Sequence, residues 1–239
     1  MQSLLQEVLD ALIEKVPPHR LKEARELLSK NYGQALSSPR IFRDEVVRLA
    51  YLASRMPATY AAVRAVLVEL SKVTEPKRWI DVGAGPGTAC WAAADLFPNA
   101  EQFVLIEKNR EMLALGKQIG SHHPNLSKAI WQGETAPEFG EMADVAMFSY
   151  SLGEMERPLE WILAWERSSI PFLVIIEPGT PRGFSLIRKA RDQILSKGCR
   201  IVAPCPHALA CPMQQGDWCH FATRLSRTKL QRYLKDAAL

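Results

Sequence analysis

The spacing of apolar residues along the chain changes near residue 76. Before that point they recur every three or four positions, as in Leu4, Leu5, Val8, Leu9, Leu12 and Ile13, which is the spacing of one helix face. Prolines and a glycine divide this region into predicted helices at residues 4–16, 18–33, 37–56 and 57–73. Ser38 is the expected cap of the third helix, with Pro39 in its first turn. We therefore predict an N-terminal helical subdomain over residues 1–75.

From Lys77 onward, short apolar runs alternate with helical segments. The predicted strands lie within residues 78–85, 101–108, 127–133, 142–155 and 171–179. The predicted helices between and after them are at residues 89–97, 110–120, 157–169 and 185–198. Residues 199–205 and 219–226 are expected to add a final pair of strands. This alternation predicts an α/β domain over residues 76–239 with a parallel, doubly wound sheet.

Composition places the chain among soluble globular proteins. Its hydrophobic share is 47%, and no apolar run approaches the roughly 18 residues that predict a membrane span. The N-terminal segment lacks the features of a signal or transit peptide, so we expect a cytoplasmic protein without a membrane partner. In a reducing compartment, clustered cysteines favour a metal site over disulfides.

Positive charge is concentrated in the C-terminal portion. From Thr180 onward there are eleven Lys and Arg against three acids, whereas the first 179 residues carry nineteen against twenty-three. The densest basic tract comprises Arg224, Arg227, Lys229, Arg232 and Lys235. A polyanion such as RNA fits this distribution, and so does a solubilising surface.

A glycine-rich loop follows the first predicted strand, in the sequence IDVGAGPGTA. A dinucleotide fingerprint, G-x-G-x-x-G/A, read from Gly83 would place Thr88 where Gly or Ala is needed. The observed form, an acid followed by Gly83, Gly85 and Gly87, is instead typical of S-adenosylmethionine enzymes. Asp81 can attract the cationic amino-acid end of that ligand. Simple turn glycines are the alternative interpretation.

Further polar residues follow the next strands. Glu107 ends the second strand, where an acid accepts hydrogen bonds from ribose hydroxyls in nucleoside-binding sheets. Gln132 can bond the adenine and Trp131 can cover it, although Trp131 also suits a core position. Ser149 follows the fourth strand and can shape the methionine pocket. The predicted cofactor-binding set is Asp81, Gly83, Gly85, Gly87, Glu107, Gln132 and Ser149.

A cysteine-rich loop is predicted at residues 203–221, between the last two strands. Cys205, Cys211 and Cys219 are spaced C-x5-C-x7-C, unlike the paired C-x2-C of common zinc ribbons. Thiolates this close in sequence need a cation if they converge, and the loop is too polar for a core. We predict a metal site on the three cysteines, with His207 or His220 able to complete a Cys3His zinc site. Buried, unreactive cysteines are the alternative.

Several stretches together resemble one family: YLASRMPATYAAVRAVLVEL, DVGAGPGTA, SYSLGE, EPGTPRGF, APCPH and WCHF. They are similar to the methyltransferase-like proteins of the small ribosomal subunit, which include bacterial members and mitochondrial assembly factors. The resemblance implies a class I S-adenosylmethionine-dependent methyltransferase fold, Rossmann-like, with seven strands and the last antiparallel. It implies cofactor binding through Asp81, the glycines and Glu107, association with small-subunit ribosomal RNA, and a mitochondrial matrix location if the source is eukaryotic.

The resemblance also implies a [4Fe–4S] cluster on Cys205, Cys211, Cys219 and a fourth cysteine. In the family that fourth cysteine lies in a further C-terminal segment, and no cysteine follows Cys219 here. The fourth ligand is therefore expected from a longer form of the chain or from elsewhere. Zinc remains the alternative metal.

The chemistry is less defined than the cofactor. Amino-group methyltransferases usually carry Asn or Asp followed by prolines after the fourth strand, where this chain reads FSYSLGEME. Methyl transfer depends mostly on positioning, so the function expected first is methylation with S-adenosylmethionine, with catalytic residues and target atom unassigned. The second hypothesis is a non-catalytic, RNA-binding ribosome assembly factor that keeps the fold.

Overall fold

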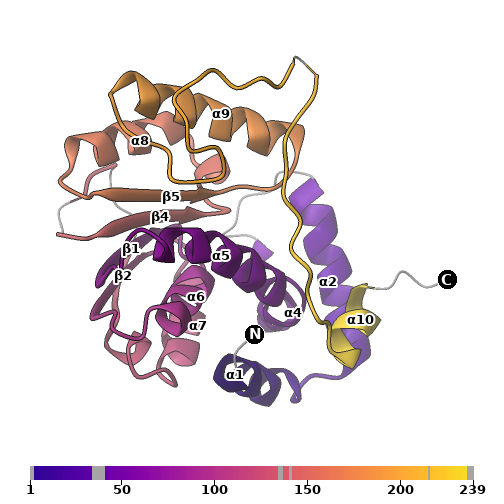
Figure 1. Cartoon of the computed structure of the whole chain (residues 1–239). Helices are drawn as coiled ribbons and strands as arrows, with labels where there is room; N and C mark the ends of the chain where they lie inside the picture. Colours follow the sequence, from indigo (N-terminus) through magenta and orange to yellow (C-terminus); the bar gives the residue numbers. More distant parts are fainter. Residues whose placement is uncertain (1–2, 34–40, 134–136, 140–141, 215, 236–239) are drawn as a thin grey trace.

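A parallel sheet of five strands lies at the centre of the structure (Figure 1). The structure is a computed structural model and describes residues 3–33, 41–133, 137–139, 142–214 and 216–235. The strands are β1 (Arg78–Val82), β2 (Gln102–Ile106), β3 (Ile130–Gln132), β4 (Val145–Ser149) and β5 (Phe172–Ile176). Their order across the sheet is β3-β2-β1-β4-β5. This is the order of the first five strands of a doubly wound Rossmann sheet.

Helices cover both faces of the sheet, which explains why its strands are almost continuously apolar. On one face lie α6 (Thr88–Leu96) and α7 (Arg110–Gly120), and on the other α8 (Pro158–Arg167) and α9 (Pro181–Ser196) (Figure 1). Alternate residues of β1 enter the two layers of core: Trp79 packs on the α6 side and Ile80 on the α8 side. The predicted α/β architecture is therefore confirmed.

The N-terminal helices pack on the α6 face and share its core. They are α1 (Ser3–Ile13), α2 (Pro18–Gly33), α4 (Glu45–Ser54) and α5 (Met56–Ser71). The expected cap Ser38 and its neighbour Pro39 lie outside the described residues. Within them, α4 begins at Glu45 because the Asp44 carboxylate accepts a hydrogen bond from the backbone N–H of Val46 at 2.7 Å. Along α5, the buried side chains are spaced for packing against α6.

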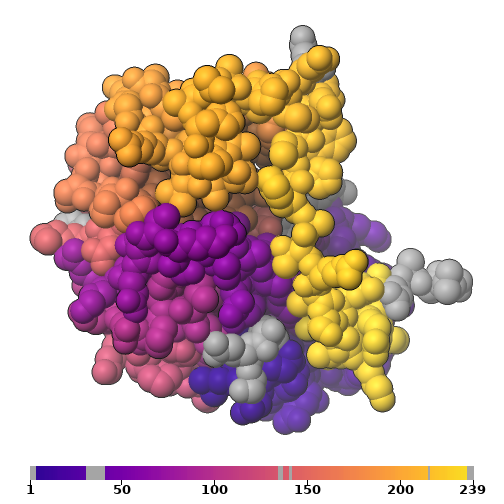
Figure 2. Space-filling model, viewed as in Figure 1, coloured from indigo at the N-terminus to yellow at the C-terminus, as the bar shows by residue number. Residues whose placement is uncertain are grey.

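The C-terminal portion departs from the sequence prediction. Residues 199–205 and 219–226 form no strands, and in the part of the chain that is described the sheet has five strands instead of seven. Instead, an irregular segment crosses the surface to a short helix, α10 (Lys229–Lys235), which packs on α2 and α4 (Figures 1 and 2). The sequence does contain a signal for the start of α10, the capping box T-x-x-Q at residues 228–231. Gln231 Oε1 accepts a hydrogen bond from Thr228 N, and Thr228 Oγ1 accepts one from Gln231 N.

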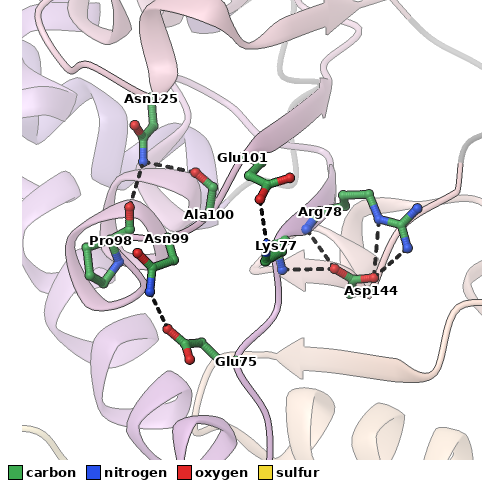
Figure 3. Close-up of polar contacts among 9 residues, drawn as sticks. All are labelled: Glu75, Lys77, Arg78, Pro98, Asn99, Ala100, Glu101, Asn125 and Asp144. Carbon is green, nitrogen blue, oxygen red and sulfur yellow. Dashed lines mark hydrogen bonds and ion pairs between the residues drawn. The ribbon is translucent and has the colours of Figure 1, made fainter.

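Polar contacts fix the amino ends of the strands (Figure 3). The Asp144 carboxylate accepts from the backbone N–H groups of Lys77 and Arg78, at 2.8 and 2.9 Å, and pairs with the Arg78 guanidinium at 2.7 Å. Burial raises the pKa of Asp144, but the Arg78 and backbone hydrogen bonds outweigh it and hold the pKa below its usual value. Lys77 also pairs with Glu101 at 2.6 Å. The contacts at the amino ends of the strands therefore stabilise the sheet, and a ligand site is expected at the carboxyl ends.

None of the described helices combines the length and the apolar character that crossing a membrane requires.

Candidate functional site

A cavity of about 1220 Å³ opens at the carboxyl ends of β1, β2 and β4. Its walls come from the glycine loop and strand ends, the helices α4 and α5, the stretch from the loop after β4 into α8, the turn before α9, and the last residue of α10. Ligand pockets usually measure roughly 300–1,000 Å³. The cavity therefore has room for a cofactor and for part of a second molecule.

The glycine loop forms the floor of this cavity, with Gly83 and Gly85 in the lining and Gly87 outside it. Gly83, Gly85 and Gly87 all have positive φ, at 72°, 55° and 80°, a region that favours glycine. A Cβ on Gly83 would lie 2.4 Å from the Cβ of Ser151, whereas a Cβ on Gly85 would meet nothing within 4 Å. Gly83 therefore serves packing, and Gly85 leaves open space where a ligand can approach the backbone.

Glu107 connects the end of β2 to the glycine loop. One carboxylate oxygen accepts from the backbone N–H of Gly85 at 2.7 Å and the other from that of Asn109 at 2.6 Å. Burial raises the pKa of Glu107, while these two hydrogen bonds lower it. The carboxylate lines the cavity and each oxygen has further lone pairs, so it can also accept from a ligand hydroxyl.

Asp81 is buried beneath the loop. Burial raises its pKa to about 7; the thiol of Cys90, which donates to Oδ2 at 3.7 Å, lowers it, and the charge of Glu107 raises it. No described residue donates to Oδ1. A buried carboxylate oxygen without a donor costs free energy, and a cationic ligand group would offset that cost.

Two hydroxyl groups at the cavity wall also lack a hydrogen-bond partner among the described residues. Thr88 begins α6 and Ser149 ends β4, and both line the cavity. Neither Thr88 Oγ1 nor Ser149 Oγ has a hydrogen-bond partner within the described ranges, although both atoms are buried. Asp81 Oδ1 is a third buried atom without a partner in the described structure, although Asp81 itself lies outside the cavity lining. This donor and acceptor set fits a polar, nucleoside-type cofactor with an amino-acid end.

Two residues assigned to the adenine lie apart from this cavity. Neither Trp131 nor Gln132 belongs to its lining. The Trp131 ring fills the space over Gly116, where a Cβ would lie 2.1 Å from Cη2, and it also contacts Gly87. Trp131 therefore packs in the core, the alternative that its sequence position allowed. Gln132 contributes its backbone carbonyl, which accepts from Glu107 N at 3.0 Å.

The loop after β4 holds a strained tyrosine and several acids. Tyr150 has φ of 57°, which costs a non-glycine residue about 1–3 kcal/mol and is commonest at functional sites. The Glu177 carboxylate accepts from the backbone N–H of Gly153 at 2.9 Å and so holds the loop. Burial raises the pKa of Glu154 on the cavity wall, and the charge of Glu107 raises it further. These groups shape the cavity without forming a recognised acid–base set.

The EPGTPRGF stretch joins β5 to α9 and has a clear structural basis. Thr180 caps α9, because its Oγ1 accepts from the backbone N–H of Gly183 at 3.2 Å. A Cβ on Gly183 would lie 2.1 Å from the carbonyl oxygen of Pro178. Glu177, the first residue of the stretch, anchors the loop after β4 through the backbone N–H of Gly153. The motif therefore positions one wall of the cavity.

The prediction that Cys205, Cys211 and Cys219 converge on a metal is not borne out. Among the described residues, no group of three His, Cys, Asp or Glu side chains is placed to hold a metal ion, and Cys205 and Cys219 are exposed. The loop instead lies along α9, where the Arg191 guanidinium donates to the carbonyls of His207 and Leu209, both at 2.9 Å. The two predicted flanking strands are absent from the described structure. As placed here, the described residues of the loop do not fit a zinc ion or an iron–sulfur cluster.

Some cavity residues carried no signal in the sequence. Tyr51 and Arg55 come from the N-terminal helices, and Lys235 comes from α10. They belong to segments interpreted as packing helices or as a general basic tract. Only the tertiary arrangement brings them to the strand ends.

Comparison with known proteins places the chain in a family. Residues 45–239 match the sequence profile described as "Mitochondrial small ribosomal subunit Rsm22". The chain is 29% identical over 246 residues to the "Rsm22-cox11 tandem protein 2, mitochondrial" of Schizosaccharomyces pombe, covering 86% of this chain and 32% of that protein. It is 27% identical over 200 residues to the human "Ribosome assembly protein METTL17, mitochondrial", covering 74% of this chain and 44% of that protein. The chain thus spans less than half the length of these relatives.

Solved structures give partial matches. A SAM dependent methyltransferase from Aquifex aeolicus is 15% identical, with a TM-score of 0.48, and the match covers 67% of this chain and 87% of that one. The amino pentose methyltransferase CalS10 from Micromonospora echinaspora, solved with SAM bound, is 18% identical, with a TM-score of 0.41 and about half of each chain covered (52% and 53%). The fold assignment rests on the strand order and the two helical layers, which are those of a class I methyltransferase-type, Rossmann-like domain.

Proposed function

The chain belongs to the Rsm22 family of the mitochondrial small ribosomal subunit, and from this premise we propose that it binds S-adenosylmethionine and acts on or with small-subunit ribosomal RNA during ribosome assembly. The curated relatives are mitochondrial by name and one is a ribosome assembly protein. These names support a small-subunit particle as the partner, and the mitochondrial matrix as the location if the source is eukaryotic.

The observation that best supports cofactor binding is a set of buried polar atoms without partners among the described residues, together with free space beside the backbone of Gly85. Asp81 Oδ1, Thr88 Oγ1 and Ser149 Oγ are buried without partners, while the space beside Gly85 is free. When bound, S-adenosylmethionine supplies an activated methyl group. We expect Asp81 to bind the ammonium of its amino-acid end and Glu107 to accept hydrogen bonds from its ribose hydroxyls.

Whether a methyl group is transferred separates two forms of this function. In the enzymatic form, the cavity wall around Tyr150 and Glu154 orients an RNA acceptor beside the cofactor, and rate enhancement comes from positioning. In the non-catalytic form, the cofactor stabilises the fold of an assembly factor. The absence of an acid–base set in the described part of the β4 loop favours neither strongly, because methyl transfer to a good nucleophile does not require one.

One labelling experiment distinguishes the enzymatic form from the non-catalytic form. Immature small-subunit particles are incubated with the protein and S-adenosylmethionine labelled in the methyl group, and ribosomal RNA is then separated from protein. Label in RNA that depends on the protein, and that a Ser149→Ala variant reduces, supports the enzymatic form. Protein-dependent particle maturation without label in RNA supports the assembly factor.

A further inference from the structure

Two basic side chains from separate parts of the chain line the cavity together. Arg55 joins α4 to α5, and Lys235 ends α10. Burial lowers the pKa of Lys235, and the positive charges of Arg55, Arg227 and Arg25 lower it further. We name Arg55 and Lys235 the rim cations.

The fold holds this arrangement in place. Leu234 of α10 is fully buried in the core shared with α2 and α4. The Lys22 ammonium lies over the Tyr233 ring, 5.1 Å from its centroid, and so links α2 to α10. Together with the Thr228–Gln231 capping box, these contacts bring Lys235 to the cavity.

The cavity between the rim cations and the strand ends has two different walls. Next to Arg55, Phe42 and Tyr51 pack edge to face with ring centroids 5.5 Å apart, and both line the cavity. The wall formed by residues 154–160 carries three acids, Glu154, Glu156 and Glu160, and one arginine, Arg157, which pairs with Glu160 at 3.0 Å. A phosphate group is therefore favoured at the rim and disfavoured on the acidic wall. A base, with its exocyclic donors, suits the space between them.

We propose that the rim cations bind the phosphate backbone of single-stranded RNA and that the adjoining nucleoside enters the outer part of the cavity beside Tyr51. Single-stranded RNA is recognised by splayed bases on aromatic side chains together with cationic contacts to the backbone. The cavity exceeds the size of an ordinary ligand pocket, so a nucleoside can occupy it together with the cofactor. This inference rests on the proposed function and identifies its substrate class and entry point.

The salt dependence of RNA binding tests this assignment. The probe is a short, fluorescein-labelled single-stranded RNA of mixed sequence, titrated at several salt concentrations and followed by anisotropy. Replacing Arg55 and Lys235 together by glutamine removes two predicted phosphate contacts, so the slope of log K against log salt should flatten by about 1.4. The matched control replaces Lys229 and Arg232, which lie on the same helix outside the cavity lining, and should leave most of the slope. Equal slopes for wild type and the Arg55 and Lys235 variant, or an equal loss in both variants, would overturn the proposal.

Two further measurements keep the result interpretable. Lys235→Gln alone should not lower the thermal stability, because burial and the neighbouring arginines already disfavour its charge, yet it should flatten the slope by about 0.7. Calorimetry with S-adenosylmethionine is run on the same variants. RNA binding through the rim cations without any cofactor binding would contradict the proposed function and leave this inference standing, whereas cofactor binding with an unchanged salt slope would do the reverse.

Discussion

At the scale of single residues, the site combines strain and unsatisfied polarity in a few positions. Asp81 and Thr88 are almost fully buried and each keeps a polar atom without a partner inside the described structure. Such groups destabilise the empty protein and stabilise a complex, because a ligand that supplies the missing partner removes a cost of about 1–3 kcal/mol for each. Residue substitutions should therefore separate stability from binding.

Asp81→Asn should uncouple stability from pH. In the folded chain burial raises the pKa of Asp81 from its ordinary value of 3.8 to about 7. Between about pH 4 and 7 the folded state therefore holds a proton that the unfolded state releases, so the free energy of unfolding falls as pH rises through this window and levels off above it. The asparagine variant should lose that slope and be more stable at pH 8, by on the order of a few kcal/mol.

Urea denaturation at a series of pH values measures this effect, with the exposed Asp192 changed to Asn as the control. The same Asp81→Asn variant should bind S-adenosylmethionine more weakly, because it cannot pair with the ammonium. Wild-type affinity should fall from pH 8 to pH 6 as Asp81 takes up a proton. A variant with wild-type pH dependence and wild-type affinity would contradict the role assigned to Asp81.

At the scale of elements, the turn between β5 and α9 positions the loop after β4. Gly183→Ala should destabilise the protein by about 1–3 kcal/mol, because the new Cβ would press against the carbonyl oxygen of Pro178. Gly133→Ala is the control, since a Cβ there meets nothing within 4 Å. Chemical denaturation of both variants gives the comparison, and a similar free energy of unfolding for the two would show that the turn tolerates a side chain.

The C-terminal helix α10 depends on its cap. Thr228→Ala removes one side of the capping box and should cost about 1 kcal/mol, which raises local opening of α10 about fivefold. Hydrogen exchange of the amides in α10 should speed up by that factor while the central strands exchange as before. Thr223→Ala, in the exposed segment before the helix, is the control. Unchanged exchange in α10 would mean that Leu234 packing alone fixes the helix.

The sequence predicted the elements that obey a local rule. Short, continuously apolar runs predicted β1, β2, β4 and β5, because both faces of the sheet are buried. The acid–glycine pattern correctly placed Gly83, Gly85 and Glu107 at the cavity. The residues after Cys199 were harder to interpret. The short apolar runs in this polar, proline-rich segment predict strands, but in the described structure they form none. The segment is held by contacts with α9, which the spacing of residues in the sequence does not predict. Trp131 and Gln132 lie outside the cavity lining, and the strand position of Trp131 leaves both a ligand contact and core packing open because it does not decide which layer the ring enters.

At the scale of the whole molecule, the cavity exists because segments that are distant in the sequence meet. The glycine loop supplies its floor, α4 and α5 supply an aromatic and cationic wall, and α10 returns from the far end of the chain to add Lys235. A ligand that spans these segments would couple the N-terminal helices to the sheet.

Calorimetric titration of the protein with S-adenosylmethionine measures cofactor binding at the glycine loop. We predict saturable binding to the wild type and its loss in Gly85→Val, whose side chain would occupy the open space beside the loop. Gly198→Val is the matched control, because Gly198 also has positive φ and open space around its Cβ but lies after α9, outside the cavity lining; it should bind as the wild type does. No binding by the wild type, or equal affinity in wild type and Gly85→Val, would contradict the account.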